Sequence, residues 1–227
     1  MIVVEKSAAA TALVITRPTR RNALDQTTLL ALREGIREAE ADTACHCLVL
    51  RGAGGTFCSG RDLGDARRDA PLEELLAYDE TWGDIIGGLR AMTKPSIAVV
   101  SGHAVAGGFT LAMACDFVLA ERGARFGALE MRGGFPAAVN TAVLTHLVSR
   151  RIALRYLLSD ETFAAEELLA HGLVSEIADG GSALERLEAA SVERLTRLDP
   201  TAVKLTKEAN RSMAASPEDV AIRSGSR

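Results

Sequence analysis

The pattern of apolar and polar residues along this chain predicts short strands in the first half and helices in the second half. Compact apolar runs at 2–4 and 12–15 predict an opening hairpin. Between 25 and 41 the apolar residues recur at helical spacing, and Asp25 or Thr27 is able to cap the start of that helix. Further strands are predicted at 47–50, 96–100 and 116–120, and further helices at 72–92, 106–115, 137–148, 150–158, 164–171, 182–198 and 201–215. This alternation indicates an α/β core followed by a helical C-terminal region.

Composition narrows the class of protein and of partner. Of the 227 residues 48% are hydrophobic and 25% are charged, which is typical of a globular chain with one core. The 26 Lys and Arg against 30 Asp and Glu give a net charge of −4, which does not favour nucleic acid as a partner. The uncharged window 96–115 has the length of a membrane span, but its glycine turns indicate a strand, a turn and a short helix. No export signal precedes the first strand, so we expect a cytoplasmic protein without a membrane partner.

The cysteines and histidines do not form a pattern that binds metal. Cys45, Cys47, Cys58 and Cys115 lack the paired spacing of a zinc site and the density of a disulfide scaffold. We therefore expect buried, reduced thiols and no metal site. His103 stands at a strand-to-glycine turn, where a packing role is favoured over a catalytic one.

Two glycine-rich segments, 51–63 and 102–108, each follow a predicted strand. Backbone N–H groups from two such turns are able to meet at one ligand oxygen and form an oxyanion hole, although most glycine turns only reverse the chain. Neither segment matches the glycine fingerprint of a dinucleotide site or the G-K-[ST] ending of a phosphate loop. Nucleotide hydrolysis is therefore disfavoured.

Several linked motifs, taken in order, resemble the crotonase superfamily, which is also called the enoyl-CoA hydratase/isomerase family. These are R-N-A-L at 21–24, F-C-S-G-R-D-L at 57–63, G-H-A-V-A-G-G at 102–108, A-R-F-G at 124–127 and H-G-L-V at 171–174. The resemblance extends over most of the chain, from Arg17 to about Ala178.

The resemblance implies a fold and an assembly. The fold class is α/β, with a crotonase-like spiral of ββα repeats over 1–178 and a helical C-terminal trimerisation region over 179–227. That region is short, or truncated, for the family. The implied partner is an acyl-CoA substrate, the implied assembly is a homotrimer or a hexamer made of two trimers, and no cofactor is expected besides the coenzyme A thioester itself.

The resemblance also implies roles for individual residues. The N–H groups of Ser59 and Gly107 would hold the thioester oxygen as an enolate forms. Glu130, an acid between apolar neighbours, would be the catalytic base, since burial raises the pKa of a carboxyl towards the range useful for proton transfer. By the same resemblance, Thr110 stands where the first of two catalytic glutamates would be, and Glu130 stands at the second position. The expected CoA-binding residues are Arg21, Ala23, Leu24, Ser59, Gly60, Arg61 and Asp62.

Thr110 separates the possible reactions. Its hydroxyl is able to orient water or to accept a hydrogen bond, but it does not take a proton near neutral pH. A 1,3 double-bond shift needs one base, whereas hydration uses two groups, so the sequence favours enoyl-CoA isomerisation. The alternatives are a hydratase, or another thioester reaction, with Thr110 in place of the first glutamate, and a non-catalytic acyl-CoA-binding subunit. Tyr78, Trp82 and Met92 either border an acyl-chain tunnel or belong to the core.

Overall fold

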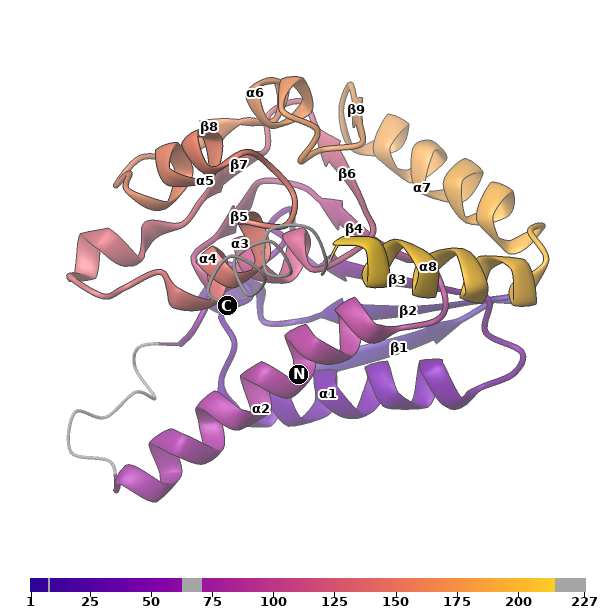
Figure 1. Cartoon of the computed structure of the whole chain (residues 1–227), viewed down its shortest axis with the longest axis horizontal. Coiled ribbons are helices and arrows are strands. Elements are labelled where there is room, and N and C mark those ends of the chain that lie inside the picture. Colours follow the sequence, from indigo (N-terminus) through magenta and orange to yellow (C-terminus); the bar gives the residue numbers. More distant parts are fainter. Residues whose placement is uncertain (8, 63–70, 215–227) are drawn as a thin grey trace, which may run out of the picture.

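The computed structural model describes residues 1–7, 9–62 and 71–214. In this part of the chain a large sheet and a small sheet are surrounded by helices (Figure 1). The strands are β1 (Ile2–Lys6), β2 (Ala10–Ile15), β3 (Cys47–Gly52), β4 (Ser96–Val100), β5 (His103–Val105), β6 (Phe117–Glu121), β7 (Arg125–Gly127), β8 (Phe163–Ala164) and β9 (Glu176–Ala178). The helices are α1 (Gln26–Ala41), α2 (Leu72–Ala91), α3 (Gly107–Met113), α4 (Ala138–Leu144), α5 (Arg150–Leu157), α6 (Ala165–Ala170), α7 (Gly181–Thr196) and α8 (Pro200–Ala214), with the 3-10 turns η1 (Pro18–Arg20) and η2 (Leu129–Gly133).

The large sheet has the strand order β1-β2-β3-β4-β6-β9. β1 and β2 are antiparallel, with Ile2 opposite Ile15, which confirms the predicted hairpin. Every later pair in this sheet is parallel. The sheet is therefore built mainly from strands that return through crossover segments, and its central strands are buried on both faces.

Side-chain alternation along the strands divides the core into two layers. On β3, Leu48 and Leu50 belong to the larger apolar cluster, whereas Val49 belongs to a second cluster on the opposite face. The larger cluster contains the apolar face of α1, and the second cluster is closed by Leu184 and Leu195 of α7. Figure 1 shows α1 and α7 on opposite sides of the large sheet.

Helix α1 illustrates how the sequence sets an element's boundary. Its first turn is capped by Asp25, whose Oδ1 accepts a hydrogen bond of 2.7 Å from the Thr28 N–H, so the predicted cap is confirmed. Leu29, Leu32 and Ile36 then recur on one face and are buried. None of the helices in the described ranges is long and apolar enough to cross a membrane.

The small sheet, in the order β5-β7-β8, holds the chain that leads to α3. β5 is parallel to β7, and an isolated bridge pairs Ala104 of β5 with Cys58, which lies in the glycine-rich turn after β3. This bridge brings the turn after β3 next to the start of α3.

Candidate active site

The two glycine turns meet through bare backbone at Gly60 and Gly107. Gly60 has a φ of 92°, and a β-carbon on it would stand 2.9 Å from the Ala106 β-carbon and 2.9 Å from the Gly107 nitrogen. A β-carbon on Gly107 would in turn stand 3.5 Å from the Gly60 Cα. Only glycine at position 60 satisfies both this φ and this approach.

Two backbone amides of the first turn have different surroundings. The Ser59 N–H donates to the Arg21 carbonyl at 3.1 Å, so a partner within the chain already accepts it. Next to it, a parallel bridge pairs Leu24 with Arg61, because the Leu24 N–H donates to the Gly60 carbonyl and the Asp62 N–H donates to the Leu24 carbonyl. Arg61 stands between these two hydrogen bonds, and in a parallel bridge the N–H of such a residue points away from the partner strand. The Arg61 nitrogen lies 3.6 Å from the site of a β-carbon on Gly107.

Ala106, which precedes α3, has an unusual backbone. Its φ of 50° and ψ of −123° lie in a region that residues with a β-carbon rarely adopt, and such strain is common where a site needs a fixed geometry. The Ala106 N–H donates to the Gly127 carbonyl at 2.8 Å, and its carbonyl accepts from the Thr110 N–H at 3.1 Å. These bonds fix the orientation of the peptide that carries the Gly107 amide.

A chain of side-chain hydrogen bonds connects Thr110, Asn140 and Glu130. The Thr110 hydroxyl donates to Asn140 Oδ1 at 2.8 Å, and Asn140 Nδ2 donates to Glu130 Oε1 at 2.8 Å. Thr110 and Asn140 are each 1% exposed. The other carboxylate oxygen, Glu130 Oε2, is buried without a hydrogen-bond partner. Burial raises the pKa of Glu130 above its usual value, while its own backbone N–H and Asn140 act in the opposite direction.

This geometry places both predicted catalytic residues in one cluster but gives them different surroundings. Glu130 has a free oxygen, whereas the Thr110 hydroxyl is buried against Asn140. Asn140 itself was missed from the sequence. The sequence shows only a single amide side chain within the short apolar helix α4. It does not show which residue this amide contacts.

The predicted CoA-binding residues lie along one edge of the first glycine turn. Arg21 is exposed, whereas Ala23 and Leu24 are buried in the core, so the latter two offer backbone atoms to a ligand. The Arg61 guanidinium forms an ion pair with Asp79 and lies 4.3 Å above the Tyr78 ring. Its side chain therefore covers α2, while its amide lies beside Gly107.

Arg17 and Asn22 hold this edge together, and sequence reasoning gave neither a role. Arg17 forms ion pairs with Asp25 at 2.9 Å and with Asp62 at 3.0 Å. Asn22 is buried at a φ of 56°, and its Nδ2 donates to the Ala53 carbonyl at 2.9 Å and to the Thr56 carbonyl at 2.6 Å. The two side chains therefore tie the loop before α1 to the glycine turn after β3.

Of the three apolar residues predicted near an acyl tunnel or in the core, two lie beside the glycine turns. Trp82 Cζ2 stands 3.5 Å from the site of a β-carbon on Gly107, and the Tyr78 hydroxyl donates to the Leu24 carbonyl at 2.7 Å. Met92, the residue that follows α2, is buried in the larger apolar cluster.

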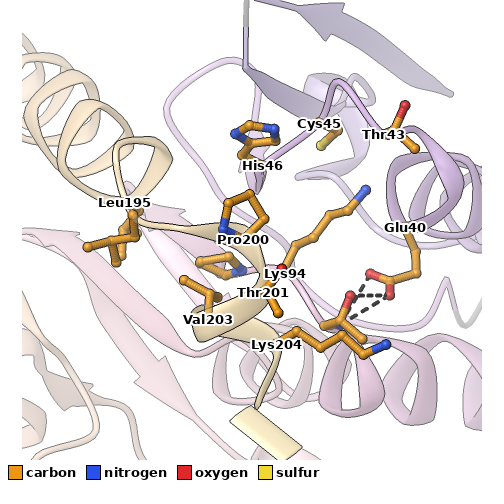
Figure 2. Close-up of a pocket in the computed structure, with 13 residues that line it drawn as sticks. Glu40, Thr43, Cys45, His46, Lys94, Leu195, Pro200, Thr201, Val203 and Lys204 are labelled. Carbon is orange, nitrogen blue, oxygen red and sulfur yellow. Dashed lines mark hydrogen bonds between the residues drawn. The ribbon is translucent and has the colours of Figure 1, made fainter. Parts of the chain in front are cut away.

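A separate pocket of about 350 Å³ lies between the end of α1, the segment 93–95 and the α7–α8 junction (Figure 2). Three of its polar side chains are bonded to neighbouring parts of the chain. Lys94 Nζ donates to the Ala39 and Asp42 carbonyls, each at 2.6 Å, and Glu40 accepts from Thr93. Neither Glu130 nor Gly107 lines this pocket, so it is distinct from the cluster described above.

Comparison with known proteins decides the family. Residues 5–224 match the family model for enoyl-CoA hydratase/isomerase. The chain belongs to this family. Among members of the enoyl-CoA hydratase/isomerase family, the (E)-benzylidenesuccinyl-CoA hydratase of Thauera aromatica is 34% identical over 86% of this chain and 76% of its own length. The 1,2-epoxyphenylacetyl-CoA isomerase of Escherichia coli is 31% identical over 74% of this chain and 65% of its own.

The fold agrees with that of the enoyl-CoA hydratase/isomerase family. The crystal structure of an enoyl-CoA hydratase from Mycobacterium smegmatis matches with a TM-score of 0.90 at 25% identity, over 99% of this chain and 88% of that one. The predicted crotonase-like α/β fold and the predicted acyl-CoA enzyme class are therefore confirmed.

Proposed function

We propose that this protein shifts the double bond of an enoyl-CoA thioester, with Glu130 as its single base. The observation that carries the proposal is the asymmetric environment of Glu130. One carboxylate oxygen is held by Asn140, and the other is buried and unpaired. The position of a second acid is occupied by Thr110, whose hydroxyl is bonded to Asn140.

One carboxylate suffices for this reaction. Glu130 Oε2 takes a proton from C2 of a 3-enoyl thioester, and the electron pair of the broken C–H bond delocalises into a dienolate with its charge on the thioester oxygen. The same oxygen then returns the proton at C4, while the double bond moves between C2 and C3. No other reactant enters, and Glu130 ends in its starting ionisation state.

The thioester oxygen needs hydrogen-bond donors as the dienolate forms. We give these roles to the amides of Gly107 and Arg61, because the two turns approach closely there and the Arg61 amide faces away from Leu24. Ser59 was predicted for the second role from its motif, but its N–H already donates to Arg21. Exposed Arg21 fits a contact to a CoA phosphate. A homotrimer stays a prediction for this chain.

The test follows double-bond migration in 3-enoyl-CoA substrates with purified protein. Glu130→Gln keeps the size of the side chain but removes the base, so we expect the rate to fall by about 10²–10⁴. Glu176→Gln makes the same chemical change at an exposed glutamate of β9. It serves as the matched control and should retain full activity. An unchanged rate in Glu130→Gln would refute the proposal.

Hydration is the second candidate, because relatives such as the Thauera aromatica protein carry the name hydratase. The same assay distinguishes the two reactions, since a hydratase forms 3-hydroxyacyl-CoA from 2-enoyl-CoA. We expect migration to exceed hydration, because the buried Thr110 hydroxyl donates to Asn140 and is not directed to a water. Binding of CoA esters without either conversion would indicate an acyl-CoA-binding subunit.

A further inference from the structure

We infer that Asn140 is a positioning residue that holds the Glu130 carboxylate ionised and directs its Oε2 to the substrate, and that Thr110 fixes the orientation of the Asn140 amide. The catalytic consequence rests on the function proposed above. The effect on the ionisation of Glu130 does not, because it is a property of the free protein.

The two ends of the Asn140 amide have different partners. Thr110 donates to Asn140 Oδ1, and Asn140 Nδ2 donates to Glu130 Oε1. Rotating the amide by half a turn would place its oxygen against the carboxylate, which is acceptor against acceptor. Asn140 and Thr110 are each 1% exposed, so solvent has little access to replace a lost hydrogen bond. The Glu130 carboxylate, which only accepts, therefore selects the orientation in which Nδ2 faces it. The Thr110 hydroxyl holds the other end of the amide, because its nearest acceptor is Asn140 Oδ1 at 2.8 Å, while the Ala106 carbonyl lies at 3.4 Å.

Asn140 also affects the charge of Glu130. A hydrogen bond donated to a carboxylate stabilises the charged form, so Asn140 lowers the pKa of Glu130 and opposes the rise caused by burial. The elements packed here, α3 and α4, carry no charged side chains. On η2 itself, Arg132 is exposed and donates to the Asp160 carbonyl. Asn140 is therefore the side chain that favours the ionised base in the described structure.

Asn140 also fixes the position of the free carboxylate oxygen of Glu130. A carboxylate held through Oε1 has a fixed rotation about its last bond, and this rotation determines where Oε2 lies. Asn140 Nδ2 also lies 3.5 Å from the Ala106 carbonyl, next to the Gly107 amide. The base and the proposed oxyanion donor are thus positioned against the same side chain, which sets their separation.

The experiment measures the pKa of Glu130 by carboxyl ¹³C NMR in the free protein, with Glu130→Gln used to assign the resonance. Asn140→Ala removes the donor, so the pKa should rise. Asn140→Asp keeps the side-chain size and places a second carboxyl beside Glu130, so we expect a further rise. Thr110→Val should also raise the pKa, and Thr110→Ser, which restores the hydroxyl, should return it to the wild-type value.

Thr141→Val is the matched control on α4. The Thr141 hydroxyl donates to the Ala137 carbonyl at 2.8 Å and does not contact Glu130, so its loss should leave the pKa unchanged. In the catalytic assay, the kcat of Asn140→Ala should fall roughly 10–100-fold, since a misplaced base costs rate without weakening binding. KM should stay near the wild-type value, and the acid limb of the pH profile should move to higher pH.

The outcomes separate the two proposals. If the Glu130 pKa is unchanged in folded Asn140→Ala and Asn140→Asp, the role of Asn140 is refuted, whatever the enzyme catalyses. If the pKa rises as expected while Glu130→Gln retains full isomerase activity, the role of Asn140 in ionisation stands and the proposed function is lost.

Discussion

At the scale of single residues, the candidate site depends on the absence of a side chain at Gly60. A β-carbon there would press on Ala106 and on the Gly107 nitrogen, and φ is positive. We expect Gly60→Ala to displace the Gly107 amide and to lower kcat by 10²-fold or so, because a shift of about 1 Å in a reacting group has this effect.

The control for this substitution is Gly83→Ala. A β-carbon on Gly83, in helix α2, would meet no atom within 4 Å. Activity should therefore be retained, and helix propensity should stabilise the protein slightly. Equal activity in Gly60→Ala and wild type would show that the contact between the turns does not position the amide.

Sequence reasoning at this scale assigns a role where the role belongs to a position in a motif, and such roles stay predictions. It selected Glu130 and Gly107, and the structure brings both into the neighbourhood of Ala106. It did not find Asn140, because the amide reaches Glu130 only after α4 folds against α3. It also did not distinguish the amides of Ser59 and Arg61, since the direction of an N–H depends on the bridge to Leu24.

At the scale of elements, the predicted helices and the longer strands agree with the structure, whereas the shortest strands were missed. The capped helix α1 and the terminal helices α7 and α8 lie within a few residues of their predicted ranges. Strands β5, β8 and β9 are two or three residues long, too short for alternation to show, and were missed. Position 215 of the last predicted helix lies outside the described residues.

One side chain joins three elements. Asp116, just before β6, accepts hydrogen bonds from the Ser96 N–H at 2.8 Å and from its hydroxyl at 2.9 Å, and it pairs with Lys207 of α8. Ser96 is fully buried at the start of β4. Asp116→Ala leaves these donors unpaired, so the free energy of unfolding should fall by about 1–3 kcal/mol in urea titrations.

Asp179→Ala is the comparison for that measurement. Asp179 pairs with Arg122 on the exposed surface, where solvent screens the charges, so its loss should not change the unfolding midpoint. Equal destabilisation by the two substitutions would contradict the role given to Asp116.

At the scale of the whole molecule, the core extends over both faces of the large sheet and contains all four cysteines. They are free and buried, as predicted. Burial raises the pKa of the Cys47 and Cys58 thiols to about 12 and raises that of Cys115 as well. The thiolate is the reactive form. These three thiols are therefore protected twice, because burial keeps reagents away from them and because the raised pKa keeps them protonated.

We therefore expect the folded protein to resist thiol reagents at pH 8 and the unfolded protein to react at all four positions. An Ellman titration, with and without guanidinium chloride, measures this difference. Rapid reaction of two or more thiols in the folded protein would contradict the described packing.

The buried pair of Thr110 and Asn140 also has an evolutionary consequence. A glutamate at position 110 would set its carboxylate against Asn140 Oδ1, so a single replacement creates a buried charge without a donor. A change at Asn140 alone would leave the Thr110 hydroxyl only the longer bond of 3.4 Å to the Ala106 carbonyl. We therefore expect that evolution from a site with one carboxylate to a site with two exchanges positions 110 and 140 together. The residues at these two positions should then covary among relatives.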